Sequence, residues 1–315
     1  MLTCPTIIWR ADVYGAVVGR EEPDAAEPGG KRMSRKLQTE NDYNYDKRKK
    51  ALLDRISAYA AEDTAVAFSG GADSTLLLRL VCGAAKKTGK RVAAVTVQTR
   101  LHPAGEIREA ARTAAALGAE HRVIAVDELA EAGIFDNPAD RCYRCKKLLF
   151  TKIRKFSVAE GIPRILEGTN EDDMHVYRPG IRALRELGII SPLADAGFTK
   201  AQVRRLAGEY GLAAAKKPAS PCMATRFPYG ARLSYEAMDR AAEGEAYLRA
   251  RGFYNVRLRV HGDIARLEVD AEDFLRILAF REDVTARMKE LGYRYVALDL
   301  EGFRSGSMDL PLNVS

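Results

Sequence analysis

Apolar runs alternate with amphipathic stretches along the middle of this chain. The apolar runs have the length of buried strands, and most of the amphipathic stretches end at a glycine, as helices often do. Strands are predicted at residues 65–68, 92–97, 122–126 and 164–166, and helices at residues 45–61, 106–117, 145–160 and 200–210. Because strands that alternate with helices form a parallel sheet covered on both faces, the pattern predicts an α/β fold with a doubly wound parallel sheet.

The pattern changes after a break at residues 216–221, which is rich in lysine, proline and serine. Beyond it, helices are predicted at residues 234–251 and 271–291, and strands at residues 255–261, 264–269 and 295–300. The first two of these strands flank Gly262-Asp263, a typical hairpin turn. This order of elements predicts a smaller α+β domain at the C-terminal end.

These patterns divide the chain into three segments. Residues 1–45 carry little core-forming content and are predicted to be a disordered extension, with Met33 as an alternative start. Residues 46–220 form the predicted α/β domain. Residues 221–315 form the α+β domain, which we expect to bind substrate or to mediate formation of a homo-oligomer.

Composition narrows the classes of protein. The 315 residues contain no apolar run near the ~20 needed to span a bilayer, and no signal peptide is recognisable, so a cytoplasmic protein without membrane contact is expected. Five cysteines, an odd number in a large chain, argue against a disulfide framework and favour metal or sulfur chemistry. The net charge of +7 suits anionic partners such as nucleotides, pyrophosphate or RNA without choosing among them.

A glycine-rich turn follows the first predicted strand and precedes a helix. Its backbone N–H groups and the helix dipole favour a phosphate. The turn lacks the lysine of a kinase-type loop and resembles instead the PP-loop of ATP pyrophosphatases, which cleave ATP between its α- and β-phosphates. The predicted ATP-binding residues are Ser69, Gly70, Gly71, Asp73 and Ser74, with Ser69 and Asp73 also expected to take part in catalysis.

A second polar segment follows the strand predicted at residues 164–166. Gly168 and Asn170 should lie at the same carboxyl edge of the sheet as the glycine-rich turn, where ligands bind in such folds. Asp172 and Asp173 are candidates for the ATP or Mg²⁺ site, with a helix-capping role as the alternative.

Three cysteines are candidates for a metal site. Cys142 and Cys145 form a C-x-x-C pair predicted to lie just before a helix, and Cys222 stands alone at the break between domains. Three thiolates are too few to close a structural zinc site, but they suit a 4Fe–4S cluster with one open iron. A redox pair or half of a zinc site is the alternative for the C-x-x-C pair. Cys82 is expected in the core.

Basic residues alternate with apolar ones in the strand predicted at residues 255–261. Arg257 and Arg259 share one face of it, which could grip the phosphate and carboxylates of a substrate. A half-exposed strand with solvated arginines is the alternative. Arg226, which lies close to Cys222, is a further candidate for binding an anion.

These motifs together resemble the ATP-dependent sulfur transferases that make the nickel-pincer nucleotide cofactor, the LarE family. The resemblance spans residues 46–308. It rests on SGGADS at 69–74, RCYRCKKLLF at 141–150, EGTNEDD at 167–173, YRPG at 177–180, SPLADAGFTKAQVRRLA at 191–207, KPASPCMATRFPYG at 217–230, RLRVHGDIARLEV at 257–269 and GFRSGSM at 302–308.

The resemblance implies a concrete reaction. ATP, with Mg²⁺, adenylates a carboxylate of a pyridinium-3,5-dicarboxylate mononucleotide, and a sulfur nucleophile then displaces AMP to leave a thiocarboxylate. Cys222 matches the sulfur cysteine of the family, which in one subgroup gives up its own sulfur. In another subgroup three cysteines hold a 4Fe–4S cluster that takes sulfur from a sulfide donor. Cys142 and Cys145 place this chain with the second subgroup.

Two other functions remain open from the sequence. A tRNA thiolase would also combine a PP-loop, an iron–sulfur cluster and positive charge, but no additional RNA-binding module is recognisable, so nucleic acid is not the expected partner. The second is a non-catalytic cluster or sulfur carrier with a vestigial nucleotide pocket. Exchange of pyrophosphate into ATP with the pyridinium substrate would exclude that carrier.

Overall fold

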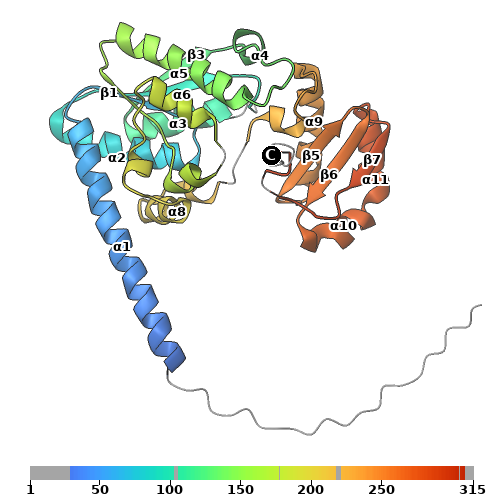
Figure 1. Cartoon of the computed structure of the whole chain (residues 1–315), viewed down its shortest axis with the longest axis horizontal. Helices are drawn as coiled ribbons and strands as arrows, with labels where there is room; N and C mark the ends of the chain where they lie inside the picture. The colour runs from blue at the N-terminus through green and yellow to red at the C-terminus, as the bar shows by residue number, and fades with distance from the viewer. Residues whose placement is uncertain (1–28, 103–105, 177, 218–220, 305, 309–315) are drawn as a thin grey trace, which may run out of the picture. The chain divides into compact units, whose positions relative to one another are not determined.

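The computed structural model describes residues 29–102, 106–176, 178–217, 221–304 and 306–308 (Figure 1). By its internal contacts the chain divides into two units, Met1–Asn44 and Tyr45–Ser315. Helix α1 (Gly29–Tyr59) begins well before the predicted start at Tyr45. Most of the predicted N-terminal extension lies outside the described residues.

The first sheet of the second unit has four parallel strands. They are β1 (Thr64–Ala67), β2 (Val92–Gln98), β3 (Glu120–Ala125) and β4 (Arg164–Leu166), in the spatial order β3-β2-β1-β4 (β1 and β3 are labelled in Figure 1). Strand β1 pairs with both β2 and β4, so that Ala65 lies between Ala93 and Ile165. The predicted strands are confirmed to within two residues at each end.

Helices connect these strands and the segments around them. They are α2 (Ala72–Thr88), α3 (Glu106–Leu117), α4 (Glu128–Glu131), α5 (Arg141–Ala159), α6 (Gly180–Glu186), α7 (Pro192–Asp195), α8 (Lys200–Glu209) and the 3-10 helices η1 (Glu171–His175), η2 (Ala213–Lys216) and η3 (Met223–Arg226). Thr199 caps α8 as a capping box with Gln202.

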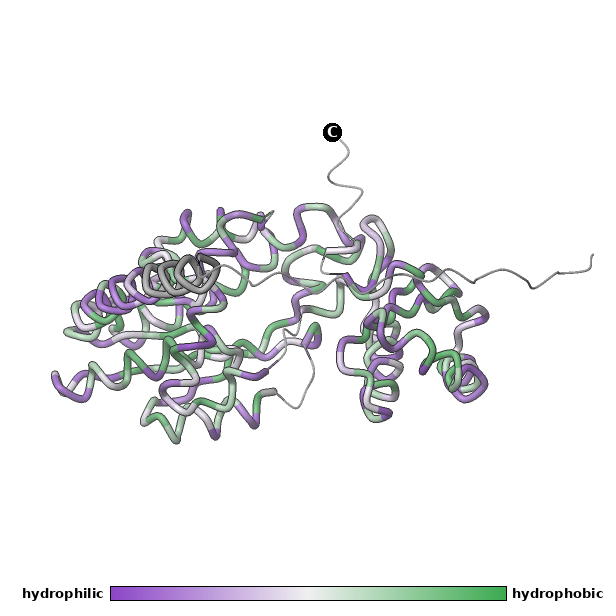
Figure 2. The backbone as a smooth tube through the Cα atoms, turned by 90° about the horizontal axis from the view of Figure 1, so that it is seen from below, coloured by the Kyte–Doolittle hydropathy of each residue, from purple (hydrophilic) through white to green (hydrophobic). Residues whose placement is uncertain are grey.

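Successive residues of the central strand point into two different cores. Val66 packs in a core with Leu76 of α2 and Leu206 of α8, whereas Ala65 packs in a second core with Phe150 of α5. Because side chains alternate across a strand, helices must cover both faces of the sheet. The predicted doubly wound α/β architecture is thereby confirmed. Along the helices hydrophobic and hydrophilic residues alternate, as expected of elements with one packed face (Figure 2).

The C-terminal region has a separate mixed sheet. Its elements are α9 (Tyr235–Ala250), β5 (Val256–His261), β6 (Ile264–Val269), η4 (Ala271–Asp273), α10 (Phe274–Ala279), α11 (Arg281–Glu290) and β7 (Tyr295–Leu298) (Figure 1). Strands β5 and β6 form the predicted antiparallel hairpin, and β7 pairs parallel to β6. This mixed sheet with its helices confirms the α+β prediction.

Two further predicted helix boundaries are wrong. The single helix expected over residues 271–291 is divided at Phe280, where the backbone leaves helical geometry; α11 then buries Val284 and Met288. Helix α5 begins at Arg141, so the C-x-x-C pair lies in its first turn rather than before it. An ion pair between Arg144 and Asp140, four residues apart, supports that extra turn.

A third core joins the two regions. Leu101, Leu129 and Ile134 from the first region pack with Phe227 and with the apolar residues of the C-terminal sheet. None of the described helices is both long and apolar enough to span a membrane. The boundary predicted at residue 220 falls in a segment, 218–220, that lies outside the described residues.

Candidate active site

The glycine-rich turn is held in shape by its own serines. Gly70 has a φ of 73°, a conformation that favours glycine, and α2 starts directly after Gly71. The hydroxyls of Ser69 and Ser74 lie 3.1 Å apart, and the Ser74 hydroxyl donates to the carbonyl of Gly71 at 3.3 Å. Asp73 is in the first turn of the helix. The turn therefore presents its amides and Asp73 at the carboxyl end of β1.

The segment after β4 meets this turn, as predicted. A Cβ atom on Gly168 would stand 3.0 Å from the amide nitrogen of Ser74, so only glycine allows the two backbones to approach this closely. Asn170 donates from its amide nitrogen to a carboxylate oxygen of Asp73 at 3.2 Å. Residues nearly a hundred positions apart are thus brought to one edge of the sheet.

A cavity of about 330 Å³ lies at this edge. Residues from the ends of β1, β2 and β4 line it, including Ser69, Asp73, Thr96, Glu167 and Gly168. Lys146 of α5 also lines it, with its ammonium 3.8 Å from a carboxylate oxygen of Glu167. Glu167 is buried and accepts hydrogen bonds from the amide and hydroxyl of Thr169, both at 2.9 Å. The cavity therefore combines an apolar interior with a few fixed polar groups, as binding sites for small molecules do.

The capping alternative for the two aspartates has structural support. Asp173 closes a capping box with Asn170 at the start of η1, and its carboxylate pairs with Arg178 at 2.9 Å. The carboxylate of Asp172 accepts the backbone amide of Lys200 at 2.9 Å, the first residue of α8. Asp173 lines the cavity, whereas Asp172 does not. A role of Asp172 at the ATP site stays a prediction.

The structure gathers the three candidate cysteines. The pKa of the Cys145 thiol is raised by burial, by the Glu128 carboxylate, and by the nearby charges of Cys222 and Cys142. The Cys145 thiol donates to Glu128 at 2.8 Å. Cys145 and Cys222 also border the same hydrophobic core. Residues that lie 80 or so positions apart therefore share one small region.

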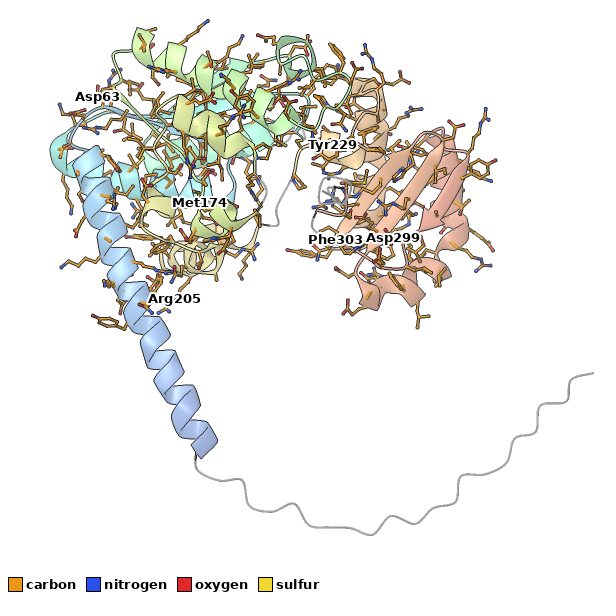
Figure 3. All side chains as sticks on the ribbon, viewed as in Figure 1. Asp63, Met174, Arg205, Tyr229, Asp299 and Phe303 are labelled. Atoms are coloured by element: carbon orange, nitrogen blue, oxygen red, sulfur yellow. The ribbon has the colours of Figure 1, made fainter. Side chains whose placement is uncertain are left out.

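A buried arginine holds the Cys222 segment against the start of α5. Arg141 donates to the Asn137 side chain at 3.0 Å, and its guanidinium lies over the Tyr229 ring at 4.4 Å (Tyr229 is labelled in Figure 3). The side chain of Asn137 in turn donates to the carbonyls of Phe227 and Pro228. Asn137 is fully buried and has a φ of 45°. These contacts hold the segment that follows Cys222 against the start of α5, so that Cys222 lies beside the C-x-x-C pair.

The thiol groups fit a three-cysteine site in type and location. Burial raises the pKa of Cys222, while the positive charge of Arg141 acts in the opposite direction and so favours a thiolate. Within the described ranges, no three Cys, His, Asp or Glu side chains already stand in a metal-binding arrangement. A cluster held by these cysteines therefore stays a prediction, and binding one would require their side chains to turn toward a common centre.

The arginines of β5 are buried rather than solvated. Arg259 is 4% exposed and pairs with the carboxylate of Glu268 at 2.8 Å. Arg257 is 9% exposed and lies over the ring of Phe303 at 5.0 Å (Phe303 is labelled in Figure 3). Since both faces of the strand are buried, the alternative of a half-exposed strand with solvated arginines is wrong.

Positive charge exceeds negative charge around these arginines. Arg226 makes two hydrogen bonds of 2.8 Å to the carboxylate of Glu245. Burial alone would raise the pKa of Glu245, but Arg226, Arg249 and Arg257 together hold it below its usual value. Burial, with the charge of Arg226, lowers the pKa of Arg257 to about 10. The buried guanidinium groups, those of Arg226, Arg257 and Arg259, outnumber the buried carboxylates of Glu245 and Glu268, an arrangement suited to bind an anion.

Comparison with known proteins decides the family. No family model matches the chain. The pyridinium-3,5-bisthiocarboxylic acid mononucleotide synthase of Lactiplantibacillus plantarum is 38% identical over 244 residues, which are 78% of this chain and 88% of that protein. The chain belongs to the LarE family.

Two further relatives align with a similar extent. An uncharacterized protein of Synechocystis sp. is 35% identical over 249 residues, covering 78% of this chain and 91% of its own length. An uncharacterized protein of Methanocaldococcus jannaschii is 29% identical over 240 residues, covering 76% and 90%. The LarE resemblance seen in the motifs is therefore confirmed, whereas the roles of individual site residues stay predictions.

Several residues at this LarE-family site were not predicted from the sequence. The ammonium of Lys200 contacts the carboxylate of Asp73 from a position 127 residues away. Arg178 and Lys146 line the cavity, and the carboxylate of Glu128 accepts a hydrogen bond from the Cys145 thiol. Arg178 and Lys146 lie within the YRPG and RCYRCKKLLF motifs, but the sequence assigned them no role. Lys146 directly follows Cys145, so one helix turn contributes to both places.

Proposed function

We propose that this chain transfers sulfur in an ATP-dependent reaction to a carboxylate of pyridinium-3,5-dicarboxylate mononucleotide. The relative from L. plantarum, named for synthesis of the bisthiocarboxylic acid product, supports this substrate and product. The observation that carries the proposal is the start of α5. There Cys142 and Cys145 lie close to Cys222, and these three cysteines are called the thiol site below. The next residue along the helix, Lys146, lines the cavity beside the glycine-rich turn.

The proposed chemistry needs two adjoining sites. A carboxylate is a poor acyl donor, so its oxygen first attacks the α-phosphorus of ATP and pyrophosphate leaves. A sulfur nucleophile then attacks the acyl carbon, AMP leaves with that oxygen, and a thiocarboxylate remains. The first step belongs to the cavity, and the second to the thiol site one helix turn away.

The chain's own groups have distinct roles in the first step. We assign the pyrophosphate to the amides of Gly70 and Gly71 and to the hydroxyls of Ser69 and Ser74, which face the cavity or shape its edge. The carboxylates of Asp73 and Asp173 line the same cavity and would hold Mg²⁺, which prefers oxygen ligands. Bound there, Mg²⁺ would offset the charge of the leaving pyrophosphate.

Cys142, Cys145 and Cys222 would hold a 4Fe–4S cluster, which when bound would supply a sulfide on its open iron. Arg141 favours the thiolate of Cys222 and fixes its segment in place. Cys145 and Cys222 pack against the third core, which includes Phe227 and Leu101. In the alternative mechanism of the same family, Cys222 gives up its own sulfur.

The experiment that tests the proposal uses the full chain, reconstituted anaerobically with iron and sulfide. We expect pyrophosphate exchange into ATP that depends on the pyridinium dicarboxylate mononucleotide, followed by a thiocarboxylate product detected by mass spectrometry. A protein that binds ATP but shows no exchange with this substrate, and that shifts tRNA in a salt-dependent gel assay, would instead be a tRNA thiolase.

Arg257 and Arg259 are expected to bind the anionic groups of the substrate. Replacing either with alanine should raise the KM for the pyridinium substrate by about 10- to 100-fold, because one charge-assisted contact is worth about 1.5–3 kcal/mol. The KM for ATP should change far less. Steady-state kinetics with each substrate varied in turn provides the measurement.

The matched control for these variants is Arg287→Ala, which removes an arginine from α11 that pairs with Glu243 and Glu290. Because Arg259 is buried against Glu268, thermal unfolding must first show that each variant is folded. Folded variants with an unchanged KM for the substrate would assign these arginines to the internal ion-pair network alone.

A further inference from the structure

Glu128 places a buried carboxylate beside the three candidate cysteines. It is the first residue of α4 and is 1% exposed. One oxygen of its carboxylate, Oε1, accepts the hydrogen bond from the Cys145 thiol at 2.8 Å. After burial, the charge of this carboxylate is a cause of the raised pKa of both the Cys145 and the Cys222 thiols. Glu128 therefore belongs to the thiol site, although it lies in none of the motifs that carry the family resemblance.

The second oxygen of this carboxylate, Oε2, is buried and makes no hydrogen bond to any part of the chain that the structure describes. The other glutamates that the structure describes as buried each meet a basic side chain: Glu167 meets Lys146, Glu245 meets Arg226, and Glu268 meets Arg259. A buried carboxylate with an unpartnered oxygen is unfavourable, because the protein does not replace the hydration that it loses. A cation bound at this oxygen would remove that penalty.

The backbone around Glu128 is held from two directions. The carboxylate of Asp127 caps α4 by accepting the backbone amide of Ala130, and the hydroxyl of Tyr235 in α9 contacts the same carboxylate. On the other side, Leu129 is fully buried in the third core. Glu128 therefore has little freedom to turn its carboxylate out into water.

We propose that Glu128 is a fourth protein ligand at the thiol site. The cysteines would bind three irons of the proposed 4Fe–4S cluster, and a carboxylate oxygen of Glu128 would bind the remaining iron until sulfide displaces it. Carboxylate oxygens are common ligands of ferrous iron in proteins. The inference rests on the proposed cluster. It gives Glu128 two effects, since the carboxylate retains that iron and competes with sulfide for it.

The first effect is tested with Glu128→Gln in the full chain. Glutamine keeps the size of the side chain and an oxygen that can accept the Cys145 hydrogen bond, but it removes the charge. After anaerobic reconstitution the variant should still carry about four irons per chain, because the cysteines remain. After one-electron oxidation with ferricyanide, it should release the fourth iron to a coloured ferrous chelator about 10- to 100-fold faster than the wild type, the scale on which groups around a metal change its affinity.

Sulfide binding should change in the opposite direction. Because the carboxylate no longer occupies the fourth iron, the Glu128→Gln protein should bind sulfide about tenfold more tightly, as expected if the carboxylate occupies roughly nine-tenths of the wild-type sites. Titration with sodium sulfide, followed by the visible absorption of the reconstituted protein, measures both dissociation constants. A merely structural role of Glu128 would instead weaken the binding of iron and of sulfide together.

Glu131→Gln is the matched control. Glu131 lies in the same helix α4, is exposed and pairs with Lys152, so the same substitution there should change neither iron release nor sulfide binding. Glu128→Leu, which removes both oxygens at a similar volume, should reproduce both effects of Glu128→Gln. Thermal unfolding of the metal-free chain establishes that each variant is folded.

Two results with the variant would overturn the inference. One is a Glu128→Gln protein that keeps its fourth iron as long as the wild type does, and the other is weaker binding of sulfide by that protein. A wild-type chain that takes up a single metal ion, or no iron, would contradict the proposed cluster and this inference together. That failure is distinguishable because it appears without any substitution.

Discussion

Replacing Cys142, Cys145 or Cys222 with alanine is expected to abolish both iron binding and repeated turnover with added sulfide. The three thiols lie in one region, where Cys142 raises the pKa of both Cys145 and Cys222, and three is the number that leaves one iron of a 4Fe–4S cluster open. After anaerobic reconstitution, the wild type should show broad visible absorption and about four irons per chain, as expected for one such cluster. Each single variant should lose both signals.

Cys82→Ala is the matched control for this prediction. Cys82 is a free, buried cysteine of α2 in a different core, so the same substitution there should retain the cluster signal. The sacrificial mechanism makes the opposite prediction for Cys142→Ala, which would remain active for one turnover. In that mechanism the wild type would lose the mass of one H₂S at Cys222, independently of iron. Intact-protein mass spectrometry after the reaction decides between the two mechanisms within the LarE family.

Asp73→Ala is expected to lower ATP-dependent formation of AMP by about 100-fold or more, the scale seen when one preorganised group is removed from an active site. Asp73 lies at the cavity, with Asn170 and Lys200 as partners, where the pyrophosphate and its metal would bind. Ser69→Ala should lower the same rate, because its hydroxyl supports Ser74 and faces the cavity. Release of pyrophosphate, followed with a coupled assay, is the measurement.

Two variants control for the loss of a carboxylate or a hydroxyl. Asp63→Ala removes a carboxylate that pairs with Arg91 at 2.9 Å (Asp63 is labelled in Figure 3). Asp63 directly precedes β1, so it lies at the amino end of that strand, whereas the cavity lies at the carboxyl end. Ser57→Ala removes an exposed hydroxyl that donates to the carbonyl of Leu53 within α1. Both should retain wild-type formation of AMP. If the Asp73→Ala and Ser69→Ala proteins are folded and form AMP at the wild-type rate, the glycine-rich turn is not the site of ATP cleavage.

Most individual strands and helices could be predicted from signals in a few neighbouring residues. Strands β1, β2 and β4 are apolar runs of the right length, and α3 and α8 end at glycines or begin at a capping threonine. Such signals act over a few residues, which is why the sequence alone was enough to place them. The boundary at Phe280 was missed because the apolar spacing continues through it into α11, whose Val284 packs in the third core.

The order of strands and helices also carried the fold class. Alternation of the two predicts a parallel sheet, and the carboxyl edge of such a sheet is where its loops gather. The contact of Gly168 and Asn170 with the turn that begins at Ser69 could therefore be expected from the sequence. The LarE family could also be recognised from the sequence, because each motif that carries the resemblance is a run of adjacent residues.

The environment of the site residues was decided only by the tertiary structure. The sequence placed Arg257 and Arg259 on one face of a strand, but it could not show that this face is buried against Glu268 and Phe303. Nor could it pair Lys200 with Asp73, or bring Cys222 beside the first turn of α5 through Arg141. Periodicity and capping report on the neighbours of a residue along the chain. Which side chain opposes it in space depends on the path of the whole chain, because contacts between distant segments form only when their elements pack together.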